Sequence, residues 1–165
     1  MKMTIVLCLI LLSVYSYSQD VVTGPFFIRD GITYHQNTNE PVIGIIQSFF
    51  PNSSQISERE TYVDGKWHGP SESFDANGQL RFRGNYKDGK PDGLSEEFHE
   101  NGQLSLKATH IDGKQDGLSE GFYENGQLRF RINHIDGKQE GLFEFFDKDG
   151  NLTDTVTYEN GVEVE

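Results

Sequence analysis

The sequence predicts an all-β protein, an elongated and twisted antiparallel β-meander in which a single sheet is built from 24-residue β-hairpin repeats. Three observations predict it. Asp-Gly and Asn-Gly dipeptides recur every 24 residues, residues 86–109 and 110–133 are identical at 14 of 24 positions, and no Gly-free segment carries a 3.6-residue apolar period. A fixed period of this size is typical of arrays in which each unit contacts only its neighbours.

Two series of dipeptides mark the chain reversals, because Asn and Gly accept the positive φ that a tight turn requires. The first series is Asp64-Gly65, Asp88-Gly89, Asp112-Gly113, Asp136-Gly137 and Asn160-Gly161. The second series is Asn77-Gly78, Asn101-Gly102, Asn125-Gly126 and Asp149-Gly150.

The alternation of apolar residues fixes the type of the Asn-Gly turn. A two-residue loop would pair Phe98 with Ser105, whereas a three-residue loop pairs Phe98 with Leu104 and gathers the apolar residues on one side. We therefore expect a type I turn followed by a bulge, with left-handed glycines at Gly78, Gly102, Gly126 and Gly150. The register of the Asp-Gly-Lys connections stays open.

Equivalent apolar residues form columns along the array, which together can make a stripe that no single hairpin could bury. A phenylalanine column comprises Phe74, Phe98, Phe122 and Phe146, and a leucine column comprises Leu80, Leu104, Leu128 and Leu152.

The 24-residue spacing divides the chain into segments. We expect a signal peptide at 1–18 and a degenerate N-terminal capping repeat at 19–61, in which Phe50 and Ile56 keep the 24-residue phase and Pro41 and Pro51 indicate interrupted or edge strands. Four repeats follow at 62–85, 86–109, 110–133 and 134–157, and a truncated C-terminal half-repeat occupies 158–165.

The first 18 residues have the layout of a cleaved secretory signal. Lys2 is followed by a mostly apolar stretch and by the small-x-small site Ser16-Tyr17-Ser18. We therefore expect export to a periplasm, cell envelope or extracellular space. The single cysteine, Cys8, falls inside this segment, so the mature chain would have no disulfide and no thiolate nucleophile.

The formal net charge of −12 makes nucleic acid and anionic lipid surfaces poor partners. No phosphate-binding loop leads from a strand into a helix, and no serine is framed by a base and an orienting acid. We expect no enzyme activity, no cofactor and no metal. The turn at Asp147 only partly resembles a calcium loop, and His110 and His134 are two ligands at most.

A column of glutamates is the strongest candidate site: Glu72, Glu96, Glu120 and Glu144. Because side chains alternate along a strand, each of these glutamates falls on the apolar side, where a carboxylate needs a charged or hydrogen-bonding partner. Either each glutamate accepts hydrogen bonds from a neighbouring turn and pins one repeat to the next, or the column lines a groove for cations or a basic peptide. Cross-strand salt bridges to the strand glutamates would account for two arginine pairs two repeats apart, Arg81 with Arg83 and Arg129 with Arg131.

Trp67 is the second candidate, because it stands where the later repeats carry Pro91, Gln115 or Gln139. It either caps the first regular hairpin or is exposed as a contact anchor for a partner. Both alternatives stay open at the level of sequence.

The unit Tyr86-Lys87-Asp88-Gly89-Lys90-x-Asp92-Gly93 with its following Asn101-Gly102-Gln103-Leu104 resembles the MORN-repeat variant. The chain resembles more closely the YwqK-type antitoxin family of toxin–antitoxin systems, across roughly residues 27–165, and Asp30-Gly31-Ile32 also resembles the start of that family. The resemblance implies a string of hairpins and neutralisation of a partner protein by binding.

These inferences lead to two hypotheses. The first is an exported, non-enzymatic module for protein–protein interaction, whose repeated hairpins display equivalent side chains about 10 Å apart. The second is an envelope-associated protein that contacts lipid or polysaccharide through its aromatic columns. The partner's identity, the binding surface and the oligomeric state are open at this point.

Overall fold

The computed structural model describes residues 20–164, so the predicted signal peptide and Cys8 lie outside the described residues. The N-terminal strands are β1 (Val21–Val22), β2 (Phe26–Arg29), β3 (Ile32–His35), β4 (Gly44–Phe49) and β5 (Ile56–Val63). The central strands are β6 (Lys66–Phe74), β7 (Leu80–Lys87), β8 (Lys90–Phe98), β9 (Leu104–Ile111) and β10 (Lys114–Gln115). The last strands are β11 (Gly117–Phe122), β12 (Leu128–Ile135), β13 (Lys138–Phe146), β14 (Leu152–Glu159) and β15 (Val162–Val164).

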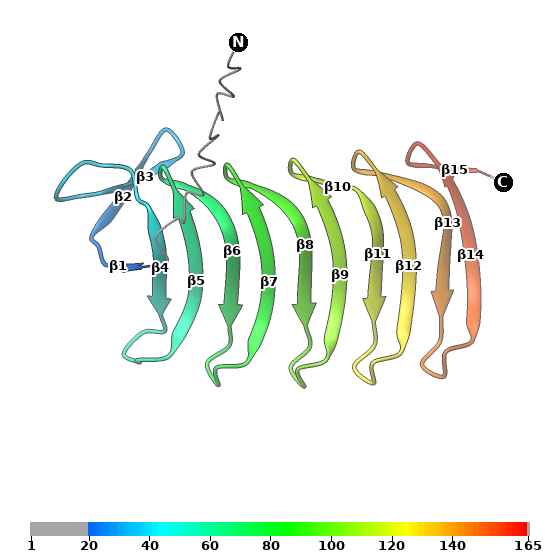
Figure 1. Ribbon diagram of the computed structural model, residues 1–165. Helices are drawn as coiled ribbons and strands as arrows, with labels where there is room; N and C mark the ends of the chain where they lie inside the picture. The colour runs from blue at the N-terminus through cyan, green and yellow to red at the C-terminus, as the bar shows by residue number, and fades with distance from the viewer. Residues whose placement is uncertain (1–19, 165) are drawn as a thin grey trace, which may run out of the picture.

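One long sheet dominates the structure and confirms the predicted meander (Figure 1). Its strands follow chain order from β4 to β15, each antiparallel to the next, with the short β10 pairing with β9 alone. The N-terminal segment departs from a single antiparallel sheet in two ways. Strand β1 pairs in parallel with β4, and β2 and β3 form a separate two-stranded sheet.

The Asn-Gly hairpins have the predicted pairing. Phe98 lies opposite Leu104, and the other three members of the phenylalanine column pair with their leucines in the same way. Within the loop the amide of Gly102 donates to the carbonyl of His99 at 2.9 Å, and Gly102 has a φ of 82°. This geometry is a type I turn closed by a left-handed glycine, as a three-residue hairpin loop requires. Gly78, Gly126 and Gly150 have φ values of 83°, 81° and 86°.

The structure settles the register that the sequence left open at the Asp-Gly turns. Ile111 pairs with Lys114, so Asp112 and Gly113 form a two-residue loop. Both loop residues have positive φ, 50° and 90°, which is the type I′ turn that matches the twist of a hairpin.

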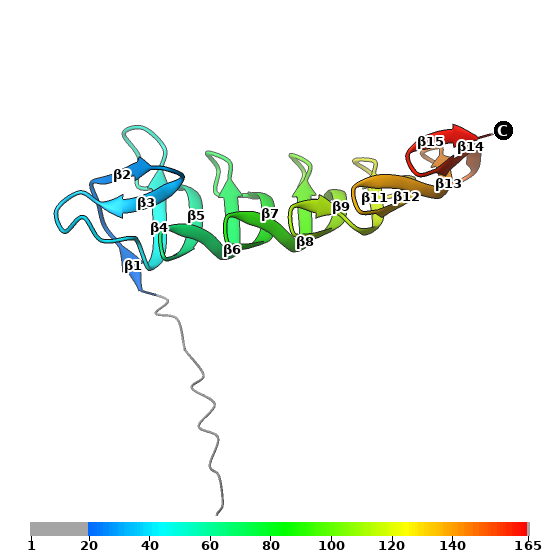
Figure 2. The same cartoon turned by 90° about the horizontal axis from the view of Figure 1, so that it is seen from above.

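A bulge in the strand that follows each Asp-Gly turn bends every repeat. Between the pairs Gly84–Ser95 and Tyr86–Pro91 the strand β8 has two more residues than β7, and Gly93 there has a φ of 107°. Bulges of this kind bend a strand and increase its twist. The strands are accordingly bowed, and the sheet is a trough with a concave and a convex face (Figure 2).

The bulge beside the Asn-Gly turn also corrects the predicted faces. Because the register shifts between Glu97 and Phe98, the apolar residues before and after the turn do not share one face. Phe98 lies on the convex face, where the Arg83 guanidinium lies over its ring at 5.7 Å. Leu106 and Ala108 instead lie with Ser95 on the concave face, where they line one hollow.

The degenerate N-terminal repeat keeps the phase only in part. Ile56 occupies the leucine position, but it pairs with Phe49 rather than with the predicted Phe50. The loop between Phe49 and Ile56 has one residue more than the loop between Phe74 and Leu80. The extra residue in the turn that contains Pro51 shifts β4 by one position.

Hydrogen bonds between turns tie successive repeats together at both edges of the sheet. At one edge, the Gly113 amide donates to the Pro91 carbonyl at 2.8 Å. At the other edge, the Asn101 Nδ2 donates to the Glu124 carbonyl at 2.6 Å. These bonds link equivalent positions of neighbouring repeats, so the array behaves as a stack of similar units.

Candidate functional site

The N-terminal segment covers the concave face at the start of the array. The Thr33 amide donates to the Gly65 carbonyl, and the Gly65 amide donates to the Val42 carbonyl, at 2.9 and 2.8 Å. Val42 is completely buried, and Tyr62 of β5 is nearly so. The hairpin of β2 and β3 therefore docks on the first repeat and closes the end of the trough.

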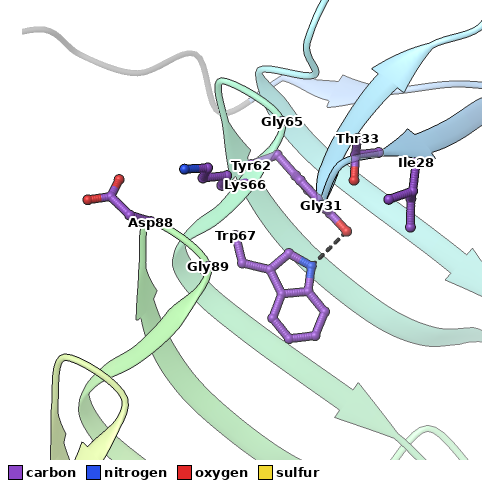
Figure 3. Close-up of a pocket in the computed structure, with 9 residues that line it drawn as sticks. All are labelled: Ile28, Gly31, Thr33, Tyr62, Gly65, Lys66, Trp67, Asp88 and Gly89. Carbon is purple, nitrogen blue, oxygen red and sulfur yellow. Dashed lines mark hydrogen bonds between the residues drawn. The ribbon is translucent and has the colours of Figure 1, made fainter.

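Trp67 lies next to this cap, at the start of β6 (Figure 3). Its indole Nε1 donates to the Tyr62 hydroxyl at 2.7 Å, and its ring meets Tyr86 edge-on at 4.8 Å. The Tyr62 hydroxyl donates in turn to the Glu60 carboxylate at 2.9 Å. Burial raises the pKa of Tyr62 to about 12 and also raises the pKa of Glu60. The group is a hydrogen-bonded aromatic cluster over a partly buried acid.

A hollow of about 430 Å³ opens between the cap and two successive Asp-Gly turns (Figure 3). Ile28 and Thr33 line it from the cap, Tyr62 and Trp67 from the first hairpin, and Asp88 from the next turn. An apolar wall with a few polar groups at the rim is the usual character of a site that accepts a side chain or small ligand.

The concave face continues from this hollow along the array. A second hollow of about 200 Å³ lies over the next repeat and is lined by Tyr86, Pro91, Leu106 and His110. At the far end Phe143 contacts Phe130 edge-on at 5.6 Å and stacks on Phe145 at 4.2 Å. Aromatic and apolar side chains thus line the trough from one end to the other.

Two Ser–His pairs lie on the same face. Ser95 and Ser119 approach Nδ1 of His110 and His134 at 3.4 and 3.3 Å. Burial and the charge of His110 lower the pKa of His134. Ser119 and His134 are both buried, and within residues 20–164 no carboxylate is hydrogen-bonded to either imidazole. The pairs therefore satisfy buried polar atoms.

The predicted glutamate column lies on the other, convex face. Glu72, Glu96 and Glu144 are ion-paired to Arg59, Arg83 and Arg131 of the preceding strand. Each partner is an arginine on the paired strand, which agrees with the cross-strand salt bridges expected for Arg83 and Arg131 and differs from the turn hydrogen bonds expected for the glutamates. Glu120 differs, because it lies between Lys107 of β9 and Arg131 of β12, and Arg131 is ion-paired to Glu144.

The turn at Asp147, which partly resembles a calcium loop in sequence, is held by hydrogen bonds within the turn. The Asp147 Oδ1 accepts the amides of Asp149 and Asn151, both at 2.9 Å, which stabilises a hairpin turn. In the described part of the chain no three His, Cys, Asp or Glu side chains gather closely enough to hold a metal ion. Residues 20–164 also contain no helix with the length and apolarity needed to cross a bilayer.

Sequence reasoning missed the column that forms the concave face near the Asp-Gly turns. Tyr62, Tyr86, His110, His134 and Tyr158 are 24 residues apart, so the spacing could have revealed them. The signal was obscured because the column changes from tyrosine to histidine and back.

The model of one protein family, described as MORN repeat variant, matches residues 67–88, 91–112, 115–136 and 139–160. These four stretches of 22 residues make up just over half of the 165-residue chain. The matches begin at Trp67 and at its three equivalents, so each covers 22 of the 24 residues of a repeat, from just after one Asp-Gly turn to the first residue of the next turn. No curated protein matches the chain.

Among solved structures, the chain is similar to part of S. aureus TarM. One structure is a TarM mutant in complex with fondaparinux, alpha-GlcNAc-glycerol and UDP, with 12% identity over 70% of this chain and 20% of that chain and a TM-score of 0.38. A structure of TarM itself has 13% identity over 70% of this chain and 20% of that chain, with a TM-score of 0.32. A GtfA/B complex bound to UDP and GlcNAc has 12% identity over 81% of this chain and 23% of that chain, with a TM-score of 0.28. The chain spans about a fifth of these proteins.

Proposed function

Because the chain belongs to the MORN repeat variant family, we propose that it is a non-enzymatic module that binds a partner protein along its concave face. The observation that carries this proposal is the lining of the trough by aromatic clusters at both ends, Trp67 with Tyr86 and Phe143 with Phe145, and by apolar side chains such as Leu106 between them. Large aromatic side chains beside hollows are the residues that anchor protein interfaces.

The mode of binding is rigid display. Hydrogen bonds between turns hold each repeat against the next, as in the bond of Gly113 to the Pro91 carbonyl. Equivalent side chains are then about 10 Å apart, since each repeat contributes two strands at roughly 4.8 Å. A pre-organised surface of this kind loses little conformational freedom on binding.

The partner segment should be neutral or basic. The chain carries a net charge of −12, and Glu97 and Asp88 line the two hollows of the trough. An acidic segment would meet like charges there, whereas a Lys- or Arg-containing segment would be attracted.

A pull-down from the native extract, with the wild type and Trp67→Ala as bait, tests the surface. Trp67→Ala should lose the captured protein while its thermal unfolding stays cooperative. Leu152→Ala is the control, because it shortens an exposed apolar side chain that lies far from the Trp67 hollow. Equal capture by wild type and Trp67→Ala would overturn the assignment of the concave face.

The single tryptophan provides an independent readout. Docking over Trp67 should shift its emission or change its quenching when the captured partner is added to the purified protein. An unchanged spectrum in the presence of bound partner would place the contact elsewhere.

A second candidate function is contact with lipid or polysaccharide through the same aromatic residues. Co-sedimentation with liposomes separates the lipid version from protein binding, because the acidic chain should not pellet at any salt concentration. Retention on immobilised polysaccharide, lost in Trp67→Ala, would favour the polysaccharide version.

Export and toxin neutralisation belong to the same proposal. Cleavage after Ser18 would give a mature N-terminus at Gln19, which N-terminal sequencing of the exported protein measures. The antitoxin role implied by the YwqK-type resemblance predicts that the captured partner inhibits growth when produced alone and is neutralised by co-production of this chain.

A further inference from the structure

The convex face carries a second apolar surface that the proposed function does not use. Five exposed side chains from successive strands β8, β9, β11, β12 and β13 form it, and we call them the apolar stripe. They are Leu94, Ile111, Leu118, Ile135 and Leu142, with exposed fractions of 38, 57, 46, 54 and 50%.

Register places these residues on one face. Leu94 pairs with Thr109, which is two residues from Ile111 on β9 and therefore on the same side. Leu94 also lines a shallow hollow with Arg83 and Glu96 of the convex face. The same pairing recurs in the next repeat, where Leu118 lies opposite Asn133, two residues before Ile135.

The order of the stripe is symmetric about its centre. Read along the array it runs Leu, Ile, Leu, Ile, Leu, with Leu118 of β11 in the middle. A two-fold axis parallel to β11 would therefore lay the stripe on a second copy of itself. Leu94 would then face the partner's Leu142, and Ile111 would face the partner's Ile135. An interface between identical copies requires this self-complementarity.

The charges at the two ends of the stripe follow the same symmetry. Lys87 lies 24 residues before Ile111, and Glu159 lies 24 residues after Ile135, at equivalent positions of the strand ends. The two-fold axis that superposes the stripe also brings Lys87 opposite the partner's Glu159. Two ion pairs between opposite charges would thus close the ends of the interface.

Several charged residues beside the stripe are ion-paired within the chain. On the turn side, Lys90 pairs with Asp112 and Lys114 with Asp136, at 2.7 and 2.6 Å. On the other side Arg131 pairs with Glu144. Two copies of a chain with a net charge of −12 repel each other in general, and these ion pairs reduce that repulsion beside the stripe.

From this geometry we infer that the apolar stripe is the interface of a homodimer, with two convex faces packed together and the repeat orders opposed. The stripe crosses five strands, so it is only about 20 Å long. That length is small for a stable interface, and the dimer should be a weak one, with a Kd in the micromolar range or above. Both concave faces then point outward, which gives the dimer two partner-binding troughs.

Sedimentation velocity over a concentration series, from about 10 µM to about 1 mM, tests the dimer. The wild type should shift from monomer to dimer with increasing concentration. Leu118→Glu should weaken association at least tenfold, because the two-fold axis places the two introduced charges against each other. Leu152→Glu introduces the same charge at an exposed leucine outside the stripe and should dimerise like the wild type.

A charge exchange tests the orientation independently of the apolar contacts. Lys87→Glu should weaken the dimer, and the double variant Lys87→Glu/Glu159→Lys should restore it, since each single change opposes like charges. A wild type that stays monomeric throughout the series would overturn the proposal. So would dimerisation of Leu118→Glu at wild-type strength, or a monomer that instead pellets with neutral liposomes through the stripe.

Discussion

Arg131 and Glu144 lie opposite each other on β12 and β13, where Nε and Nη2 of the arginine donate to the two carboxylate oxygens. The same guanidinium lies over the ring of Phe146, 5.7 Å from its centroid. Arg83 bridges Glu96 and Phe98 in the same manner, two repeats earlier. The arginine, the glutamate and the phenylalanine thus form one unit of the convex face.

Removal of the carboxylate charge should lower stability where this unit is complete. We expect Glu144→Gln to reduce the melting temperature measurably at low ionic strength, because a two-point arginine–carboxylate pair is lost. Glu97→Gln is the matched control, because Glu97 is an exposed glutamate of the concave face with no ion pair within residues 20–164, and it should change the melting temperature less. Equal effects of the two substitutions would contradict a pinning role for the pair.

The same pair predicts a dependence on acid. The hydrogen bond from Arg131 lowers the pKa of Glu144 from its ordinary value of 4.5. Stability from the pair is therefore present above this value and is lost as the pH falls through the lowered pKa. Thermal melts between about pH 6 and pH 3 should show a smaller loss for Glu144→Gln than for the wild type.

His134 predicts a second dependence on pH in a different range. Burial and the charge of His110 lower its pKa from 6.5, so the unfolded chain takes up a proton first as the pH falls. Stability is complete above pH 6.5 and declines as the pH falls from 6.5 towards the lowered pKa. Melts at pH 7.5 and pH 5 should differ more for the wild type than for His134→Gln.

Gly121 should not tolerate a side chain. A Cβ at this position would lie 2.2 Å from Cε1 of Phe130, whose ring is held by an edge-on contact with Phe143. We expect Gly121→Ala to cost about 1–3 kcal/mol in the free energy of unfolding, measured by urea titration. Phe130→Leu should remove the clash, so the double variant should lose less than the sum of the single changes.

Val42 holds the cap on the array and is completely buried. Val42→Ala removes two methyl groups from that contact and should cost roughly 2 kcal/mol in the free energy of unfolding. Ile43→Ala is the neighbouring control, because Ile43 is exposed, and it should be close to neutral. Hydrogen exchange should show faster opening of β2 and β3 in Val42→Ala, while β8 and β9 keep their protection.

Much of the fold could be predicted because the relevant information is local. The pairing of Phe98 with Leu104 follows from a three-residue loop and from the alternation of the flanking strands. The alternation of residues also indicated the glutamate column and cross-strand salt bridges from Arg83 and Arg131 to strand glutamates, but not which glutamate each arginine contacts. The sequence separation of 13 residues between Arg131 and Glu144 becomes a contact only once the register of the Asp-Gly turn is known.

The sequence by itself determined the period, the strands and the three-residue turns, because these depend on residues within one repeat. Only the tertiary structure decided which face each side chain occupies. One extra residue at the bulge beside the Asn-Gly turn places Leu106 and Ala108 on the face opposite Phe98. Counting alternate residues along the chain cannot predict the face beyond such a shift. For the same reason the aromatic trough and the apolar stripe, the two surfaces proposed to bind, emerge only when successive repeats are stacked in space.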